Sequence, residues 1–432
     1  MNFKSLTLHE WRQFKDVNID FHPSLTIITG TNGSGKSTIL KILDHDDGPD
    51  GGNQFLATPV EDKTSGRSGY SLGSLFGRLN PFTRSTAASH SAFRYEVGSI
   101  TYADGKTAEL AVQDRSSLHY YLEVKGYQNT TGFKIESHRA LPMYQQVDSL
   151  PVAGIAPKEA FSYFFESQAN FQRGSSTHRR GRTVHNPVAP LKETLIGFAA
   201  FGSDNNHMKA VPELVGLYEG FQDTLRTLLP KEIGFERLEV RSPEIVVVSR
   251  TGEFPIDGAS GGLMSLIQTA WQIFLFTKAH GEQVSVLLDE PENHLHPSLQ
   301  RDFLSNLVRT FPKIQFVVAT HSPFIISSVR NSRIYTLRYV ELAEDIGDSK
   351  SAVVAEEVVL ENKAGSASKI LSEVLGVSVT IPIWAEAELE QIAGRFEKSS
   401  LTQEALDVLR TELAGAGLSE FFPEALGRVL RD

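Results

Sequence analysis

Two short stretches of the chain carry most of the residues that could do chemistry. The first, SVLLDEPENHLHP at residues 285–297, contains the carboxylates Asp289, Glu290 and Glu292 and two histidines. The second, GTNGSGKST at residues 30–38, contains three glycines, one lysine and four hydroxyl side chains. Carboxylates can hold a divalent cation or activate water, whereas a glycine-rich loop suits phosphate. The context of the two stretches decides between a metal hydrolase and a nucleotide-binding protein.

The glycine-rich stretch matches the phosphate-binding pattern G-x-x-x-x-G-K-[ST]. It follows LTIIT, an apolar run of strand length at residues 25–29, and precedes ILKIL at helical spacing. Glycines let backbone N–H groups wrap around phosphate oxygens, and the start of a helix adds a partial positive charge. Lys36 is expected to reach the β- and γ-phosphates, and the Ser37 hydroxyl is expected to hold Mg²⁺. The expected nucleotide-binding residues are Gly30, Thr31, Asn32, Gly33, Ser34, Gly35, Lys36, Ser37 and Thr38.

The carboxylates follow VSVLL at residues 284–288, which predicts a buried strand and a Walker B arrangement. Side chains alternate at a strand end, so Asp289 and Glu290 can serve different partners. Asp289 is expected to support Mg²⁺, and Glu290 to polarise the water that attacks the γ-phosphate. His294 and His296 have the spacing of some zinc sites, but a closed zinc site needs four ligands. A structural role for these two histidines is therefore favoured.

A third element lies in DGASGGLMSLIQTAWQIFLF, where Ser260, Gly261 and Gly262 precede an apolar run of helix length. Small residues at the start of a helix leave backbone N–H groups free for a further phosphate contact. An ordinary glycine-rich start of a helix is the alternative. Ser260 precedes Asp289 along the chain, and His321 follows Asp289 at a similar separation, in FVVATHSPF.

This order of motifs resembles that of the ABC-type ATPases of the RecF/SMC branch. DEPENHLHP followed by THSP is particularly similar to the OLD-like and defence-associated members, and WRQFKDVNIDF resembles their opening hairpin. The resemblance covers residues 1–44 and 255–340. It implies an α/β fold, in which a P-loop head with a mixed sheet flanked by helices carries an antiparallel β lobe.

The resemblance also implies ATP and Mg²⁺ as ligands and a head-to-tail homodimer that encloses two ATP molecules. The signature of one subunit would cap the γ-phosphate bound by the other. Glu290 would activate water, and His321 would contact the γ-phosphate. Arg12 is a candidate phosphate contact, and Gln145 or Gln146 is a candidate contact to Mg²⁺ and water.

The rest of the chain divides by composition. A stretch rich in glycine, serine and threonine predicts a mobile insertion, and strand-like alternation around residues 92–124 predicts the antiparallel lobe. After residue 340 the sequence becomes acidic and helical. The expected organisation is an ATPase head at residues 1–350, with the mobile insertion at 45–91 and a helical insertion at about 151–235, and a C-terminal helical unit at 351–432 that docks a partner.

Composition limits the class further. The 432 residues include no cysteine, which excludes disulfides and thiolate zinc sites and fits a cytoplasmic protein. No apolar run reaches the ~18 residues of a membrane span, so no membrane partner is expected. The net charge of −10 argues against non-specific coating of nucleic acid by the whole surface.

The resemblance favours an ATPase that controls an effector, a nuclease or toxin, in anti-phage defence of the Septu, retron or PARIS kind. The alternative is a RecF-like DNA-repair or recombination ATPase whose function is ATP-dependent DNA binding. Glu344, Asp345 and Asp348 could imitate part of a nuclease cluster, but they lack the supporting strand pattern.

DNA or RNA could contact QRGSSTHRRGRTVHNP, which contains Arg173, Arg179, Arg180 and Arg182 and no acidic residue. A solvated loop is the alternative. Replacing the last three arginines together by glutamate should lower nucleic-acid affinity and its salt dependence. The slope of log K against log salt should fall by about 0.9 for each phosphate that the variant no longer binds. Fluorescence anisotropy with labelled DNA at several salt concentrations measures both, and identical isotherms would assign these arginines to a solvated loop.

Overall fold

The chain forms two compact units, Met1–Ile370 and Leu371–Asp432. The sequence suggested a boundary after residue 350, but β19 (Ser349–Glu357) is hydrogen-bonded to β18 (Arg333–Ile346) and β2 (Phe14–Asp20) of the first unit. The computed structural model describes residues 2–44, 53–61, 68–71, 94–113, 118–139, 143–147, 156–179, 182–184, 186–202, 204, 209–346, 349–358, 367–375, 382–396 and 402–429.

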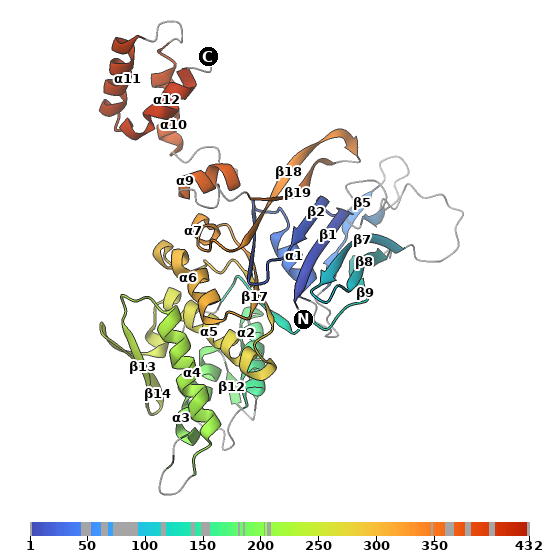
Figure 1. The fold of residues 1–432 in the computed structure, drawn as a ribbon, viewed down its shortest axis with the longest axis vertical. Coiled ribbons are helices and arrows are strands. Elements are labelled where there is room, and N and C mark those ends of the chain that lie inside the picture. The colour runs from blue at the N-terminus through green and yellow to red at the C-terminus, as the bar shows by residue number, and fades with distance from the viewer. Residues whose placement is uncertain are drawn as a thin grey trace, which may run out of the picture. The chain divides into compact units, whose positions relative to one another are not determined.

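A twelve-stranded mixed sheet forms the centre of the first unit (Figure 1). Its strand order is β10-β16-β17-β3-β18-β19-β2-β1-β7-β8-β9-β4. Neighbours from β10 to β18 pair in parallel, and neighbours from β2 to β4 pair antiparallel, which confirms the expected mixed sheet with an antiparallel lobe. The remaining strand bounds are β1 Phe3–Trp11, β3 Leu25–Gly30, β4 Gln54–Leu56, β7 Arg94–Tyr102, β8 Thr107–Gln113, β9 His119–Lys125, β10 Gly132–Ile135, β16 Ser285–Asp289 and β17 Gln315–Ala319.

The parallel strands explain the apolar runs of the sequence. Every residue of β3, β16 and β17 is buried, because a parallel sheet is covered on both faces. Asp289 pairs with Ala319, and Ala319 pairs with Ile28, so the three strands end at nearly the same level. The residues that follow these strands therefore meet at one edge of the sheet.

Helices cover this sheet and position the S-G-G element. Helix α1 (Lys36–Leu43) packs against β3, β16 and β17. Helix α5 (Gly261–His280) is buried over most of its length and contacts α2 (Pro157–Gln172) and α4 (Pro212–Leu228). The ring centroids of Phe221 on α4 and Trp271 on α5 lie 4.7 Å apart. The other helices of this unit are α3 Val188–Gly202, α6 Pro297–Thr310, α7 Pro323–Ile326 and α9 Ala367–Lys369, with the 3-10 turn η1 at Ile256–Gly258 and the π-helical turn η2, Ile370–Val374, across the boundary.

The two expected insertions differ in how much of them the structure describes. Helices α2, α3 and α4 occupy the expected helical insertion together with a two-stranded sheet, and most of the 45–91 stretch lies outside the described residues. Among the helices described, none is both long and apolar enough to cross a membrane. The remaining strands are β5 Thr58–Glu61, β6 Ser68–Ser71, β11 Thr177–Arg179, β12 Arg182–Val184, β13 Phe235–Arg241, β14 Glu244–Ser249 and β15 Gly252–Pro255.

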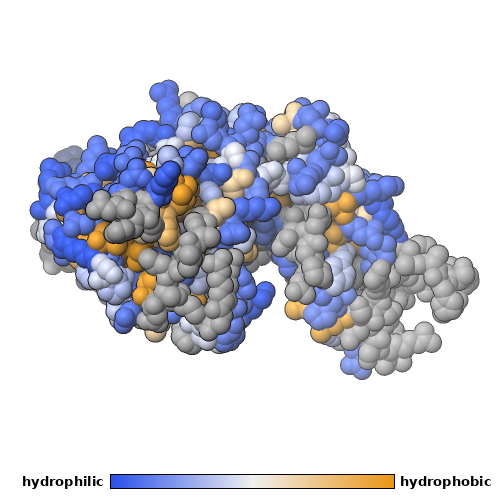
Figure 2. Space-filling model, turned by 90° about the horizontal axis from the view of Figure 1, so that it is seen from below, coloured by the Kyte–Doolittle hydropathy of each residue, from blue (hydrophilic) through white to orange (hydrophobic). Residues whose placement is uncertain are grey.

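The second unit is helical and acidic. It contains α10 (Ile383–Ala393), α11 (Gln403–Gly415) and α12 (Phe422–Val429), with the 3-10 turn η4 at Ser419–Phe421. Its core is a separate cluster of Ala385, Leu389, Ile392, Leu409, Leu413, Leu418 and Ala425. Residues 371–432 include eleven acidic and five basic side chains, a net charge of −6. The face of the protein drawn in Figure 2 is largely hydrophilic, with small apolar patches between polar side chains.

Candidate nucleotide-binding site

The loop between β3 and α1 has the backbone of a phosphate cradle. Gly30 and Gly35 have φ angles of +143° and +100°. A Cβ atom on Gly30 would lie 2.4 Å from the carbonyl oxygen of Leu337, and one on Gly35 would lie 2.4 Å from the ring of Phe14. Only glycine satisfies both the backbone angle and the space at these two positions. Residues 31–33 are exposed, so the loop is open to a ligand.

Lys36 lies folded across this loop. Its Nζ donates hydrogen bonds to the carbonyl oxygens of Gly30 at 3.1 Å and Thr31 at 3.2 Å. Burial lowers the pKa of Lys36 to about 8, although the charges of Glu290 and Asp289 oppose this shift. A bound phosphate would raise this pKa again, because a nearby opposite charge favours the ammonium form.

Asp289 lies where a Mg²⁺ ligand is expected. It accepts a hydrogen bond from Ser37 Oγ at 3.2 Å, and its other oxygen lies 3.5 Å from Lys134 Nζ. Burial raises the pKa of Asp289, and the charge of Lys134 opposes this shift. The donor set fits Mg²⁺, which prefers oxygen ligands and is commonly held by one or two protein groups together with phosphates and water.

Glu290 has a backbone conformation that is rare for its residue type. Its φ angle is +44°, and its N–H donates to the carbonyl oxygen of Ala319 at 2.9 Å. Asn293 Nδ2 donates to Glu290 Oε2 at 3.2 Å, and His321 Nε2 lies 3.7 Å from Oε1. Such conformations cost on the order of 1–3 kcal/mol and cluster at functional sites. The carboxylate is therefore held at a fixed place beside the loop.

Glu292 connects the turn after β16 to the end of β17. Its Oε1 accepts hydrogen bonds from Thr320 Oγ1 at 2.7 Å and from the backbone N–H of His321 at 2.8 Å. Burial raises the pKa of Glu292, and these hydrogen bonds oppose the shift. Burial and then the charge of Lys36 lower the pKa of His321. Both effects favour the neutral form of the His321 ring.

Arg139 connects the same turn to helix α5. Its Nη1 donates to Ser265 Oγ and, at 3.3 Å, to the carbonyl oxygen of Pro291. The side chain is fully buried, and its Nε and Nη2 atoms make no hydrogen bond within the described part of the chain. Burial lowers the pKa of Arg139 to about 10, and the charge of Glu292 opposes the shift. The guanidinium of Arg139 therefore lies between helix α5, which begins with the S-G-G element, and the turn after β16 that contains Glu290 and Glu292 (the carboxylate turn).

The S-G-G element lies at the exposed start of α5. Ser260 Oγ accepts a hydrogen bond from the backbone N–H of Leu263 at 3.3 Å and so caps the helix. A Cβ atom on Gly262 would lie 2.8 Å from the carbonyl oxygen of His294. Gly262 is therefore required for packing within the chain, while Ser260 is open to solvent.

Other candidates from the sequence lie in different surroundings. Arg12 donates to the Tyr120 hydroxyl at 3.3 Å, and Gln145 Nε2 donates to the carbonyl oxygen of Thr183 at 3.4 Å. His296 Nδ1 accepts a hydrogen bond from the backbone of Ser298 and caps α6. No three His, Asp or Glu side chains among the described residues form a metal-ligating group. Of the remaining candidates, His294 follows the Walker B turn at a φ of +69°, Gln146 and Arg173 are exposed, Arg179 and Arg182 end the paired strands β11 and β12, and Arg180 and Asp348 lie outside the described residues.

The sequence alone predicted no role for Lys134, Arg139 or Asn293. Lys134 and Arg139 lie outside the motifs, and their importance depends on contacts with residues more than 100 positions away. Asn293 lies within the Walker B stretch, but its contact with Glu290 depends on the turn geometry after β16. One weak signal was present, because Lys134 interrupts an otherwise apolar strand, GFKI. A lysine in a buried strand requires an acidic partner.

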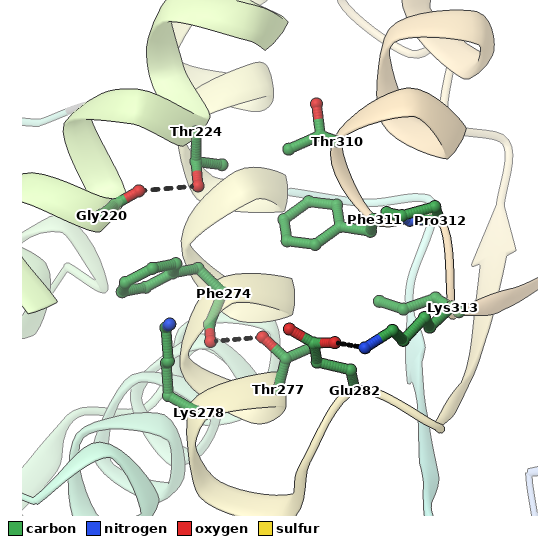
Figure 3. Close-up of a pocket in the computed structure, with 11 residues that line it drawn as sticks. Gly220, Thr224, Phe274, Thr277, Lys278, Glu282, Thr310, Phe311, Pro312 and Lys313 are labelled. Atoms are coloured by element: carbon green, nitrogen blue, oxygen red, sulfur yellow. Dashed lines mark hydrogen bonds and ion pairs between the residues drawn. The ribbon is translucent and has the colours of Figure 1, made fainter.

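A separate cavity of about 210 Å³ lies between α4, α5 and the segment before β17 (Figure 3). Phe274 and Phe311 line it, and an ion pair of 2.6 Å joins Glu282 to Lys313 at its side. None of the phosphate-loop residues lines this cavity. This cavity is therefore separate from the candidate nucleotide site, the open loop after β3.

The fold and the loop together define a P-loop nucleotide-binding protein. Residues 25–327 match the family model described as "AAA domain, putative AbiEii toxin, Type IV TA system", and the chain belongs to this family. Residues 5–44 also match a model described as an AAA domain. The family is one of ATPases, which agrees with the class expected from the sequence.

Several relatives are named after retron and Septu systems. The Retron Vc95 probable ATPase of Vibrio cholerae serotype O1 biovar El Tor is 45% identical over 49 residues, 11% of this chain and 10% of that protein. The Septu protein PtuA of Bacillus thuringiensis is 24% identical over 185 residues, 40% of this chain and 44% of that protein. The matches thus span less than half of the relatives' length. An SMC head domain from Thermotoga maritima aligns over 83% of this chain and all of that chain, with 16% identity and a TM-score of 0.41.

Replacing Glu292 by alanine should lower the free energy of unfolding by about 1–3 kcal/mol, because two buried donors would lose their acceptor. Glutamine should retain most of the stability, since its carbonyl oxygen can still accept. Replacing Glu282 by alanine is the matched control, because its ion pair with Lys313 is exposed and contributes about 1 kcal/mol or less. Urea denaturation monitored by tryptophan fluorescence measures all three. An alanine variant at position 292 as stable as wild type would contradict the role given to Glu292.

Proposed function

We propose that the protein binds ATP in the loop after β3 and hydrolyses it with Glu290 as the group that activates water. The observation that carries the proposal is the meeting of Lys36, Asp289, Glu290 and His321 around one loop. Ser37 is hydrogen-bonded to Asp289, the charge of Glu290 acts on Lys36, and His321 Nε2 lies 3.7 Å from Glu290 Oε1.

In the proposed reaction, Lys36 leaves the carbonyl oxygens of its own loop and binds the β- and γ-phosphates. Glu290 accepts a proton from the attacking water, and Asn293 and the backbone bond to Ala319 keep the carboxylate in place. The ring of His321 donates a hydrogen bond from Nε2 to a γ-phosphate oxygen. Proton transfer by a positioned carboxylate contributes about 10²–10⁴-fold to the rate.

Ser37 and Asp289 would hold Mg²⁺. Bound there, the ion would neutralise charge that develops on the β- and γ-phosphate oxygens. The protein's part is to keep the two oxygens together, and Lys134 helps by fixing the second oxygen of Asp289.

Ser260, Gly261 and Gly262 are proposed to cap the γ-phosphate bound by a second copy of the chain. Ser260 is exposed at the start of a 20-residue helix, and the start of a helix favours negative charge. Arg139 joins this helix to the turn that follows Glu290. Closure of a head-to-tail homodimer on ATP would thus act on a helix already connected to the subunit's own catalytic turn.

The proposed biological role is control of an effector protein, a nuclease or toxin, in anti-phage defence. The support is the similarity to relatives named after retron and Septu systems. The second, acidic unit is the proposed docking site for the effector, and residues 1–350 and 351–432 remain the proposed functional division. A cytoplasmic location is part of the same proposal.

Replacing Glu290 by glutamine should lower the turnover number for ATP by about 10²–10⁴-fold and leave ATP affinity within a few-fold, because only the proton acceptor is lost. Phosphate release and calorimetric titration measure the two quantities. Replacing the exposed Glu282, which precedes β16, by glutamine should change neither. Equal turnover by the Glu290 variant and wild type would refute the catalytic assignment.

The dimer proposal predicts complementation between two inactive variants. Ser260→Arg should bind ATP but not hydrolyse it, because the arginine blocks the partner's γ-phosphate. Lys36→Ala should bind ATP weakly but keep an intact S-G-G element. Mixing them creates heterodimers in which one site pairs an intact loop with an intact cap, so phosphate release should partly recover.

Subunit exchange is checked with two differently tagged variants. Mixing wild type with a large excess of Lys36→Ala, so that few wild-type homodimers remain, provides the reference for a single intact site. If the subunits exchange and the reference mixture is active, but the two variants together release no more phosphate than each alone, capping by the second copy is contradicted. Loss of ATP binding by Ser260→Arg alone would place Ser260 in its own subunit's site.

A further inference from the structure

An exposed aromatic ring lies directly beside the phosphate cradle. Tyr339 on β18 is 48% exposed, and its hydroxyl donates a hydrogen bond to the carbonyl oxygen of Gly33 at 2.9 Å. Gln13 Nε2 donates to the same oxygen at 3.4 Å. A large ring left in solvent next to a ligand site, with its far end fixed to that site, is a candidate contact for the ligand.

The sheet register explains how Tyr339 reaches the loop. Leu337 pairs with Gly30, the last residue of β3, and β18 continues beyond that point (Figure 1). Tyr339 lies two residues further on and so faces the same side as Leu337. Tyr339 pairs with Val353, and Val353 pairs with Phe14. These paired residues form a row across the neighbouring strands β18, β19 and β2.

The order of strands determines whether the γ-phosphate or the nucleoside of a bound nucleotide would lie near Tyr339. The groups that would act on the γ-phosphate follow β16 and β17, on one side of β3, whereas β18 lies on the other side. Glu290 and His321 must face the γ-phosphate if they act on it. The α-phosphate and the nucleoside are then directed away from β17 and toward β18.

We propose that the ring of Tyr339 is the stacking surface for the base of the bound nucleotide. The inference rests on the proposed function and adds a specificity determinant to it. Phosphate contacts alone would not distinguish ATP from inorganic polyphosphate, whereas a stacked base contributes only when a nucleoside is present. Every base has a π face, so stacking on Tyr339 acts on ATP and GTP alike.

The test compares a non-hydrolysable ATP analogue with inorganic tripolyphosphate by calorimetric titration. Tyr339→Ala should weaken binding of the analogue about tenfold or more and leave tripolyphosphate affinity unchanged. Tyr339→Phe keeps the ring and loses only the hydrogen bond to Gly33, so it should bind the analogue within a few-fold of wild type. Tyr121→Ala is the matched control, because Tyr121 is 45% exposed on β9 and should affect neither ligand.

Each outcome decides between specific alternatives. An equal loss for both ligands in Tyr339→Ala would show that the residue shapes the cradle, and no loss for either would show that it makes no contact. Both outcomes overturn the inference, whereas the proposed binding of ATP by the wild-type protein stands. Wild type that binds neither ligand would overturn the proposed function itself. A Tyr339→Phe variant as weak as Tyr339→Ala would assign the effect to the hydrogen bond and not to the ring.

Discussion

The hydrogen-bonded register of β3, β17 and β16 determines the position of every group in the candidate site. Asp289 pairs with Ala319 and Ala319 with Ile28, so the phosphate loop, the carboxylate turn and His321 all leave the sheet at one edge. A slip of one residue would turn Asp289 to the other face. The three strands are buried throughout, so their neighbours on both faces of the sheet surround these positions. The chemistry of the site therefore depends on the packing of the sheet.

The local part of the site could be predicted from the sequence, and its tertiary part could not. The phosphate loop and the paired carboxylates follow from residue types at fixed spacing, and the structure places both at the ends of predicted strands. Lys192 shows the limit, because its fully buried ammonium bonds to Asp257 at 2.5 Å and Glu244 at 2.6 Å. Nothing in the sequence around Lys192 indicates these partners, which belong to η1 and β14. The extent of the first compact unit is a further example, since β19 begins at Ser349 and its pairing with β2 joins segments near the two ends of that unit's sequence.

The residues of the S-G-G element are required for different physical reasons. Ser260 caps α5, and Gly262 lies so close to the His294 carbonyl that any side chain would collide with it. The sequence alone favoured a phosphate contact and an ordinary start of a helix about equally. The structure shows the helix cap made by Ser260, and the phosphate contact stays a prediction. Gly262 serves the packing of α5 on the carboxylate turn. That packing keeps the exposed Ser260 and Ser265, the hydrogen-bond partner of the buried Arg139, at the start of one helix.

The negative charge of the chain is distributed unevenly between its two units. Of the net charge of −10, the second unit carries −6, so the first unit carries only −4 although it is by far the longer of the two. At physiological ionic strength the Debye length is about 8 Å, and charges further apart than this are largely screened from one another. The first unit, taken alone, is nearly neutral for its length. Most of the net acidity belongs to the second unit, so the net charge of the whole chain does not describe the first unit.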